Sequence, residues 1–149
     1  MGGYGGGQMG GFGGGMGGMG MNIMPGQPYK ILSAYDRQYC LDSSQGMFDK
    51  GDLILYQFHG GQNQVFKFQP DHNCPGAYYI LNFKDGALEP PENWNEPGGQ
   101  CWLDDRTYDD TQSWRIQPGY GQAQGRGFHI VMSDGPGFCL DVEGENFNN

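Results

Sequence analysis

The sequence predicts an all-β protein, and three observations lead to that class. Apolar and aromatic runs of four to six residues are bounded throughout by Gly, Asp, Asn and Pro, which is typical of strands and turns. No stretch of a dozen residues combines helical periodicity with freedom from Gly and Pro. A phrase also recurs about every 50 residues, and a fixed period indicates one supersecondary unit used several times.

Each copy of the phrase has an aromatic-x-Ile strand, an apolar-acidic turn and a Gln two residues before an aromatic. The first copy consists of Tyr29-Lys30-Ile31, Cys40-Leu41-Asp42 and Gln64-Val65-Phe66. The second consists of Tyr78-Tyr79-Ile80, Ala87-Leu88-Glu89 and Gln112-Ser113-Trp114. The third has Phe128-His129-Ile130 and Cys139-Leu140-Asp141, and the sequence then ends at Asn149. The third repeat therefore reads as truncated.

The individual strands follow from the same composition. Strand signals fall at residues 29–33, 53–58, 65–68, 78–81, 100–103, 114–116 and 128–132. A Pro-rich stretch at 90–99 predicts a long loop inside the second repeat. A Gly/Gln stretch at 119–127 predicts a linker between the second and third repeats.

The N-terminus has a different composition from the rest. Of the first 20 residues 13 are Gly, so residues 1–27 are expected to form a flexible Gly/Met-rich tail ahead of a domain at 28–149. The domain divides into repeats at about 28–72, 77–119 and 127–149. The tail is either a spacer without specific function or an interaction arm, in which residues 1–24 dock on a protein partner or self-associate.

Charge and composition exclude several classes of partner. The net charge is −9 and the few Lys and Arg form no basic stripe, which argues against nucleic-acid binding. No apolar run is long enough to insert into a membrane. A signal peptide and an Asn-x-Ser/Thr acceptor are both missing, so we expect a cytoplasmic or other intracellular location.

The four Cys allow two interpretations. Their even number is compatible with disulfides, whereas the repeat-equivalent positions of Cys40 and Cys139 favour small buried thiols. No C-x-x-C occurs and the three His are dispersed, so neither a metal site nor a cofactor is expected. We favour four reduced thiols.

With these motifs, residues 28–149 resemble the ricin-B-type lectin family, a β-trefoil built from three four-stranded repeats. The second repeat carries the family's Gln-x-Trp in full as Gln112-Ser113-Trp114, and the first carries it as Gln64-Val65-Phe66. The resemblance implies that the aromatics pack together below the barrel cap and that the Gln amides bind local backbone groups. Secreted members bridge the turn Cys to a Cys after the aromatic strand, but Phe58 stands near that place, which supports an intracellular location.

The resemblance also implies carbohydrate-binding residues of a galactose-type site. Such a site uses a carboxylate for the sugar hydroxyls, an aromatic for the apolar ring face and an amide for the far side. In the first repeat these are Asp42, Tyr56, Asn63 and Gln64. The weaker second set is Glu89, Trp102, Thr111 and Gln112, with Gln100 on the same strand, and the weakest site retains only Asp141. In the alternative interpretation, the turn carboxylates only bind local backbone groups.

The sequence therefore predicts a non-enzymatic module that recognises a glycan or glycoconjugate. The clustered carboxylates Asp104, Asp105, Asp109 and Asp110 fit a solvated turn, and no nucleophile has a local partner motif. The alternative function is a scaffold protein that uses a degenerate trefoil and its Gly-rich arm for assembly. Three explanations suit the incomplete third repeat: the arm or a partner completes the barrel, loops close it, or the chain is a fragment.

Overall fold

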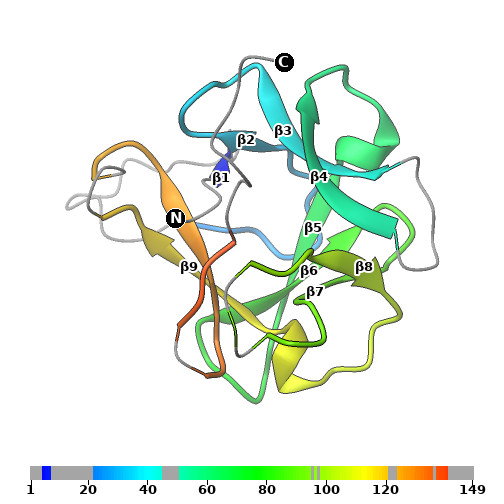
Figure 1. Ribbon diagram of the computed structural model, residues 1–149, viewed down its shortest axis with the longest axis vertical. Coiled ribbons are helices and arrows are strands. Elements are labelled where there is room, and N and C mark those ends of the chain that lie inside the picture. Colours follow the sequence, from blue (N-terminus) through cyan, green and yellow to red (C-terminus); the bar gives the residue numbers. More distant parts are fainter. Residues whose placement is uncertain are drawn as a thin grey trace.

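The structure is a computed structural model that describes residues 5–7, 22–44, 51–94, 96, 98–120, 124–135 and 137–140. Within these residues the regular structure consists of antiparallel strands and short 3-10 helices, so the predicted all-β class is confirmed. No helix in this part of the chain has the length and apolarity needed to cross a membrane. Figure 1 shows the strands wrapped around a common centre.

The first repeat contributes four strands. They are β2 (Ile31–Ser33), β3 (Tyr39–Ser43), β4 (Gly51–Gln57) and β5 (Phe66–Pro70). β3 and β4 form a five-pair antiparallel ladder from Tyr39↔Gln57 to Ser43↔Leu53. The 3-10 helix η2 (Gln62–Gln64) leads into β5, and the bridge Tyr29↔Phe66 joins the two ends of the repeat.

The second repeat has the same plan. Its strands are β6 (Ala77–Asn82), β7 (Ala87–Glu89), β8 (Trp102–Asp104) and β9 (Trp114–Pro118), with the 3-10 helix η3 (Asp110–Gln112) before the last. β5 pairs along its whole length with β6, so the last strand of one repeat lies beside the first strand of the next. β6 also pairs with β9, which closes the second repeat as Tyr29↔Phe66 closes the first.

The third repeat begins in the same way. β10 (Phe128–Met132) pairs with β9 in full register, and Val131 forms a bridge with Cys139. The remaining strand, β1 (Gly5–Gly7), comes from the Gly-rich N-terminus and pairs with β2 (Figure 1). The expected flexible tail thus contains an ordered segment at residues 5–7, whereas most of residues 1–21 lies outside the described part of the chain.

One local expectation is wrong. The sequence predicts turns at Cys40-Leu41-Asp42 and Ala87-Leu88-Glu89, but these residues lie in strands β3 and β7. They are strands because they pair with β4 and β8, which come from further along the chain. Local turn signals do not report such long-range pairing.

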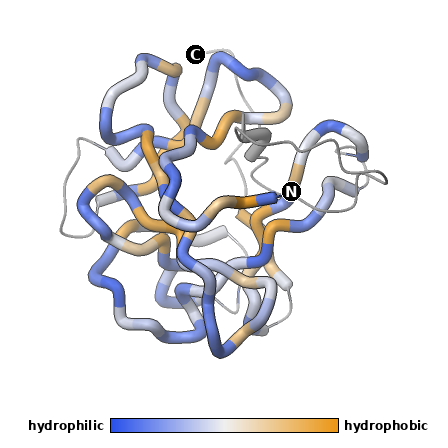
Figure 2. The backbone as a smooth tube through the Cα atoms, turned by 180° about the vertical axis from the view of Figure 1, so that it is seen from behind, coloured by the Kyte–Doolittle hydropathy of each residue, from blue (hydrophilic) through white to orange (hydrophobic). Residues whose placement is uncertain are grey.

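The core follows the threefold repetition. Equivalent branched residues from the repeats are almost fully buried in one cluster: Ile31, Ile80 and Ile130 are 1%, 0% and 2% exposed. The aromatics Phe66 and Trp114 join this cluster at 0% and 1% exposure, as the resemblance implies for the first two repeats. Burial of each such side chain contributes about 1.5–3 kcal/mol. In Figure 2 the hydrophobic segments accordingly lie toward the interior.

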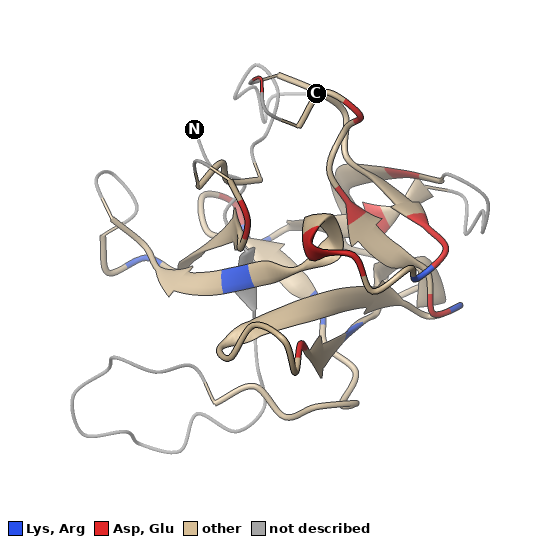
Figure 3. Cartoon of the chain, turned by 90° about the horizontal axis from the view of Figure 1, so that it is seen from below, with Lys and Arg blue, Asp and Glu red and all other residues tan. Residues whose placement is uncertain are grey.

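Charged residues are distributed over the strands and loops, and most of those in the described chain are at least partly exposed. Figure 3 shows Lys and Arg dispersed over the described chain, with Asp and Glu more numerous. The dispersion that the sequence indicates therefore persists in space. The arrangement of paired repeats around a shared apolar centre is that of a β-trefoil, as the sequence predicts.

Candidate functional site

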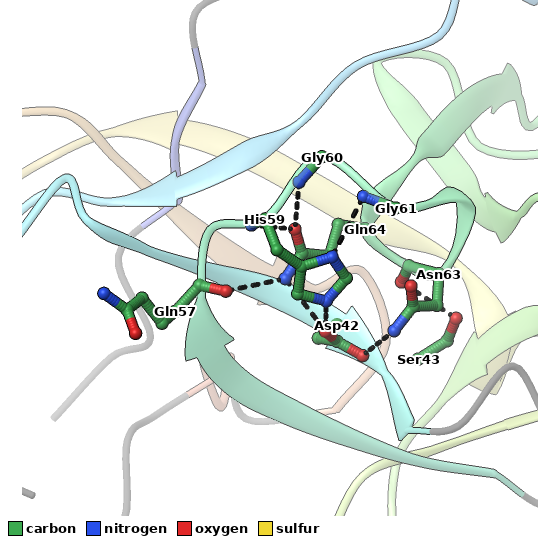
Figure 4. A network of polar contacts seen from close by, with 8 residues as sticks. All are labelled: Asp42, Ser43, Gln57, His59, Gly60, Gly61, Asn63 and Gln64. Carbon is green, nitrogen blue, oxygen red and sulfur yellow. Dashed lines mark hydrogen bonds and ion pairs between the residues drawn. The ribbon is translucent and has the colours of Figure 1, made fainter.

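The first repeat holds a buried carboxylate at the centre of a polar network (Figure 4). Asp42 lies on β3 opposite Ile54 of β4, and only 2% of its surface is exposed. Its Oδ1 accepts a hydrogen bond from Asn63 Nδ2 at 2.7 Å, and its Oδ2 accepts one from Gln64 Nε2 at 2.9 Å. Asn63 and Gln64 are thus brought to Asp42 from 21 and 22 residues away along the chain.

Gln64 organises the loop around this carboxylate. Its Oε1 accepts hydrogen bonds from the backbone N–H groups of His59 (2.9 Å) and Gly60 (3.1 Å). Its Nε2 donates to the carbonyl oxygen of Gln57 at 3.0 Å as well as to Asp42. A 1% exposed amide that satisfies four partners is a structural element, as the resemblance implies for this Gln.

The glycine after Gly60 makes the loop compact. A Cβ at Gly61 would lie 2.6 Å from His59 Cε1 and 2.7 Å from Asn63 Oδ1. Only a residue without a side chain therefore lets His59 and Asn63 approach as they do. Gly60 has a positive φ of 78°, which favours glycine as well.

His59 belongs to the site, although no sequence motif marked it. Its Nε2 faces Asp42 Oδ2 at 3.5 Å, and 46% of its side chain is exposed. Its Nδ1 accepts a hydrogen bond from the N–H of Gly61 at 3.1 Å, which leaves Nε2 as the protonated nitrogen directed at the carboxylate. His59 is thus a half-exposed side chain that lies directly against the buried Asp42 carboxylate (Figure 4).

Tyr56 supplies an exposed aromatic ring beside this network. It lies on β4 opposite Cys40, and 53% of its surface is exposed. Its ring meets the His59 ring edge to face, with centroids 6.0 Å apart. An aromatic face that is left open in this way can pack against an apolar ligand surface. The structure thus places Asn63 and Gln64 on the Asp42 carboxylate, and Tyr56 next to the His59 ring that faces it.

The second repeat reproduces the scaffold of this network. Gln112 donates from Nε2 to Glu89 Oε2 (3.2 Å) and to the carbonyl of Asp105 (2.9 Å), and its Oε1 accepts from the N–H of Thr107 (3.0 Å). Thr107 therefore stands where the first repeat has His59. Glu89 and Gln112 are brought together as predicted.

Two other members of the second set lie elsewhere. Trp102 is opposite Glu89, which is the position of Ile54 and not of Tyr56, whereas Asp104 is opposite Ala87 as Tyr56 is opposite Cys40. Gln100 donates its amide to the carbonyl oxygens of Leu53 and Cys101, both at 2.8 Å, and so joins the two repeats. The equivalence of Trp102 with Tyr56 that the sequence suggests is thus shifted by two residues.

The third predicted site consists of Asp141 alone. Asp141 lies outside the described residues, although its neighbour Leu140 is 7% exposed and packs in the core. The N–H of Leu140 donates to the carbonyl of Ile130 at 2.9 Å.

The first site offers a carboxylate that can accept further hydrogen bonds. A carboxylate has about four acceptor positions, of which Asn63 and Gln64 occupy two in Asp42. Burial and, secondarily, the charge of Asp42 raise the pKa of the nearby Cys40 thiol to about 11, so this Cys is a protonated, unreactive thiol near neutral pH. Among the described residues no group of His, Cys, Asp and Glu could hold a metal ion.

Comparisons with known proteins agree with the architecture. No protein-family model and no curated protein matches the chain. The designed threefold symmetric protein ThreeFoil is 20% identical with a TM-score of 0.57 and covers 78% of this chain and 91% of its own. A lectin from Polyporus squamosus, solved bound to a human-type influenza-binding epitope, is 19% identical with a TM-score of 0.56 over 80% of this chain.

The natural proteins in this comparison are longer. This chain spans 44% of the Polyporus squamosus lectin chain, and 17% of the chain of a mosquitocidal holotoxin that is 17% identical with a TM-score of 0.56. At these identities the similarity concerns the fold. The protein therefore has the β-trefoil fold that its resemblance to the ricin-B-type lectins implies.

Proposed function

We propose that this protein is a non-enzymatic carbohydrate-binding module that recognises a galactose-type or related glycan through its first repeat. The observation that carries the proposal is the Asp42 carboxylate, held by two side-chain amides beside an exposed Tyr56 ring. The residues of the proposed site are Asp42, Tyr56, Asn63 and Gln64, of which the buried Gln64 acts by positioning the carboxylate, and His59 is added to them as the side chain that faces it.

The polar part of the site suits vicinal sugar hydroxyls. Asn63 and Gln64 fix the orientation of the carboxylate, so that its remaining acceptor positions are presented without a loss of side-chain freedom on binding. Hydrogen bonds to a charged acceptor contribute about 1.5–3 kcal/mol each. A sugar hydroxyl that takes the place of His59 at Asp42 would gain such a bond. The half-exposed imidazole would then turn outward and contact the sugar from the side.

The apolar part is Tyr56. A sugar ring has one face of C–H groups, and the 53% exposed Tyr56 ring offers a flat surface for it. The edge-to-face contact with His59 holds the ring next to the carboxylate network. Polar and apolar recognition are therefore adjacent in one place, which is the usual composition of a small-ligand site.

The second repeat is the weaker site in this proposal. Thr107 replaces the imidazole, and Asp104 occupies the register position of Tyr56. An exposed aromatic platform next to Glu89 is thus exchanged for a carboxylate. The remaining Glu89–Gln112 pair serves the fold.

A glycan array followed by calorimetry with the best-retained sugar tests the proposal. Tyr56→Ala removes an exposed ring, so it should leave the fold intact and weaken binding about 3- to 10-fold, as expected for loss of an aromatic contact. Asp42→Asn should weaken binding about 10- to 100-fold because it removes the charged acceptor. The matched control Glu89→Gln, at the equivalent position of the second repeat, should retain the affinity of the wild-type protein.

Two results would contradict the assignment. Binding that survives both Tyr56→Ala and Asp42→Asn would place the sugar elsewhere. Equal losses in Glu89→Gln and Asp42→Asn would show that the first repeat has no special role. Circular dichroism of each variant separates loss of binding from loss of fold.

A second candidate function is protein assembly on a degenerate trefoil, with residues 1–24 as the arm. The observation that favours it is strand β1, which shows that part of the Gly-rich segment can pair with a sheet edge. Folded wild-type protein that retains no sugar on the array would favour this function. We also propose an intracellular location, since Cys40, Cys74 and Cys101 are free thiols, as is usual for proteins in a reducing compartment.

A further inference from the structure

Strand β1 occupies a specific place in the barrel. In the first two repeats the last strand pairs with the first strand of the next repeat, as β5 does with β6 and β9 with β10. The third such position lies beside β2, and it is filled by β1 from the N-terminus. β1 also contacts β10, so it lies between the first strands of the first and third repeats (Figure 1).

The register of β1 matches that of the two strands it corresponds to. Phe66 begins β5 opposite Asn82, and Trp114 begins β9 opposite Met132. Ser33 is the residue of β2 equivalent to Asn82 and Met132, because each stands two residues after the buried Ile of its repeat. Gly5 is opposite Ser33. Gly5 thus has the register position of the barrel aromatics.

The next residue has the position of a solvent-side residue. Gly6 is opposite Leu32, as Lys67 is opposite Leu81 and Arg115 opposite Val131. Lys67 and Arg115 are only partly buried, whereas the flanking Phe66 and Phe68 are fully buried. A side chain at position 6 is therefore expected on the outer face of the barrel.

A strand made of glycine can contribute only its backbone. It gives β2 hydrogen-bonding partners and covers an edge that would otherwise offer unpaired N–H and C=O groups to another chain. It adds no buried side chain, and glycine loses more conformational freedom on ordering than any other residue. The closing contact is therefore expected to be much weaker than that of β5 or β9.

We propose that strand β1 (Gly5–Gly7) is the closing strand of this trefoil barrel, supplied by the same chain, and that it keeps the edge of β2 from pairing with a second copy. In this role β1 covers, from within the same chain, a strand edge that lies between β2 and β10. Opening this contact makes the edge available for self-association through strand addition.

Substitutions in the full-length chain at β1 test the proposal with opposite expected signs. Gly6→Thr favours the strand and places its side chain outward, so the melting temperature should rise by about 2–5 °C. Gly5→Pro combined with Gly6→Pro removes one N–H directed at β2 whatever the phase of the ladder, because consecutive N–H groups point to opposite edges. This variant should melt about 5 °C lower or more, and should sediment as concentration-dependent oligomers.

The matched control places the same two prolines further along the arm. Gly14→Pro combined with Gly15→Pro changes the composition of the arm equally but lies beyond β1. It should melt and sediment as the wild-type protein does. If both double-proline variants behave alike, or if Gly6→Thr lowers the melting temperature, the proposed strand is refuted.

A cross-link decides whether the strand comes from the same chain. Residues opposite each other in an antiparallel pair have Cα atoms about 4.5–5.5 Å apart, which suits a disulfide. Gly5→Cys combined with Ser33→Cys should therefore form, on mild oxidation, a 5–33 disulfide in a species of monomer mass. The control Gly13→Cys combined with Ser33→Cys should form far less of the corresponding 13–33 disulfide. A 5–33 bond that joins two copies, or no enrichment over the control, would overturn the proposal.

Discussion

Removal of the Gln64 side chain is the most direct test of how the first repeat is built. Gln64→Ala deletes four hydrogen bonds at once, to Asp42, Gln57, His59 and Gly60. The equivalent substitution Gln112→Ala deletes three, to Glu89, Asp105 and Thr107. Both amides are almost completely buried, at 1% and 0% exposure, so the two variants form a matched pair.

The expected magnitudes differ because the carboxylates differ in burial. Asp42 is 2% exposed, and loss of a hydrogen bond to such a charge costs about 1.5–3 kcal/mol. The other groups freed by Gln64→Ala belong to exposed residues, Gln57 at the end of β4 and His59 and Gly60 in the loop that follows, where water replaces much of each bond. We expect a total of about 3 kcal/mol for Gln64→Ala. Glu89 is less buried and its bond is longer, at 3.2 Å, so Gln112→Ala should cost about 1.5–2 kcal/mol.

Urea unfolding followed by tryptophan fluorescence measures both values. The free energy of unfolding of a native domain is about 5–15 kcal/mol. Both variants should therefore remain folded in the absence of urea, so that their free energies of unfolding can be compared. A cost below about 1 kcal/mol for Gln64→Ala, or an equal or greater cost for Gln112→Ala, would refute the reasoning. Such a result would mean that the buried carboxylate is satisfied without Gln64.

Three further predictions concern other groups. His59→Ala should change the free energy of unfolding by less than about 1 kcal/mol, because its contact with Asp42 is long and half-exposed, while glycan retention falls; thermal melts and affinity columns measure the two. Burial opposes the ionisation of Asp71, but hydrogen bonds from Ser113 and the backbone of Asn73 outweigh it and lower the pKa. The ionised Asp71 therefore stabilises the folded protein above its unfolded pKa near 4, and this contribution is lost as pH falls through the folded pKa. In urea unfolding, Asp71→Asn should lose less free energy of unfolding between pH 7 and pH 3 than the wild-type protein. Burial raises the pKa of Cys40 and Cys101 to about 11, so both should resist alkylation at pH 8 until the protein unfolds, and mass spectrometry with and without urea would show rapid native labelling if this is mistaken.

Much of the fold could be predicted because it repeats. The recurring Ile, Leu and aromatic positions mark residues that share one core, and the structure buries Ile31, Ile80 and Ile130 together. Repetition thus converts a weak local pattern into a strong one. It does not report pairing between distant segments. The apolar-acidic phrases therefore predict turns, whereas the structure has them as strands β3 and β7.

The candidate site was only partly predictable. Asp42, Asn63 and Gln64 follow from the resemblance, and the structure brings their side chains into contact. His59 carries no motif, because its place at Asp42 depends on the turn at Gly60 and Gly61 and on the amide of Gln64. The misplacement of Trp102 has the same origin, since the register of β7 and β8 is set by long-range pairing.

The order of residues alone indicates the all-β class and the repeat, because both are periodic patterns, whereas Asp42 is named through the family resemblance and its burial on β3 emerges only with the fold. Only the tertiary structure decided that His59 lies against Asp42 and that Gly5–Gly7 lie beside β2. A run of glycines has no side chains, so its sequence carries no hydrophobic or polar pattern from which a pairing partner could be predicted. Its place in the barrel depends on the backbone edge that the other strands leave open.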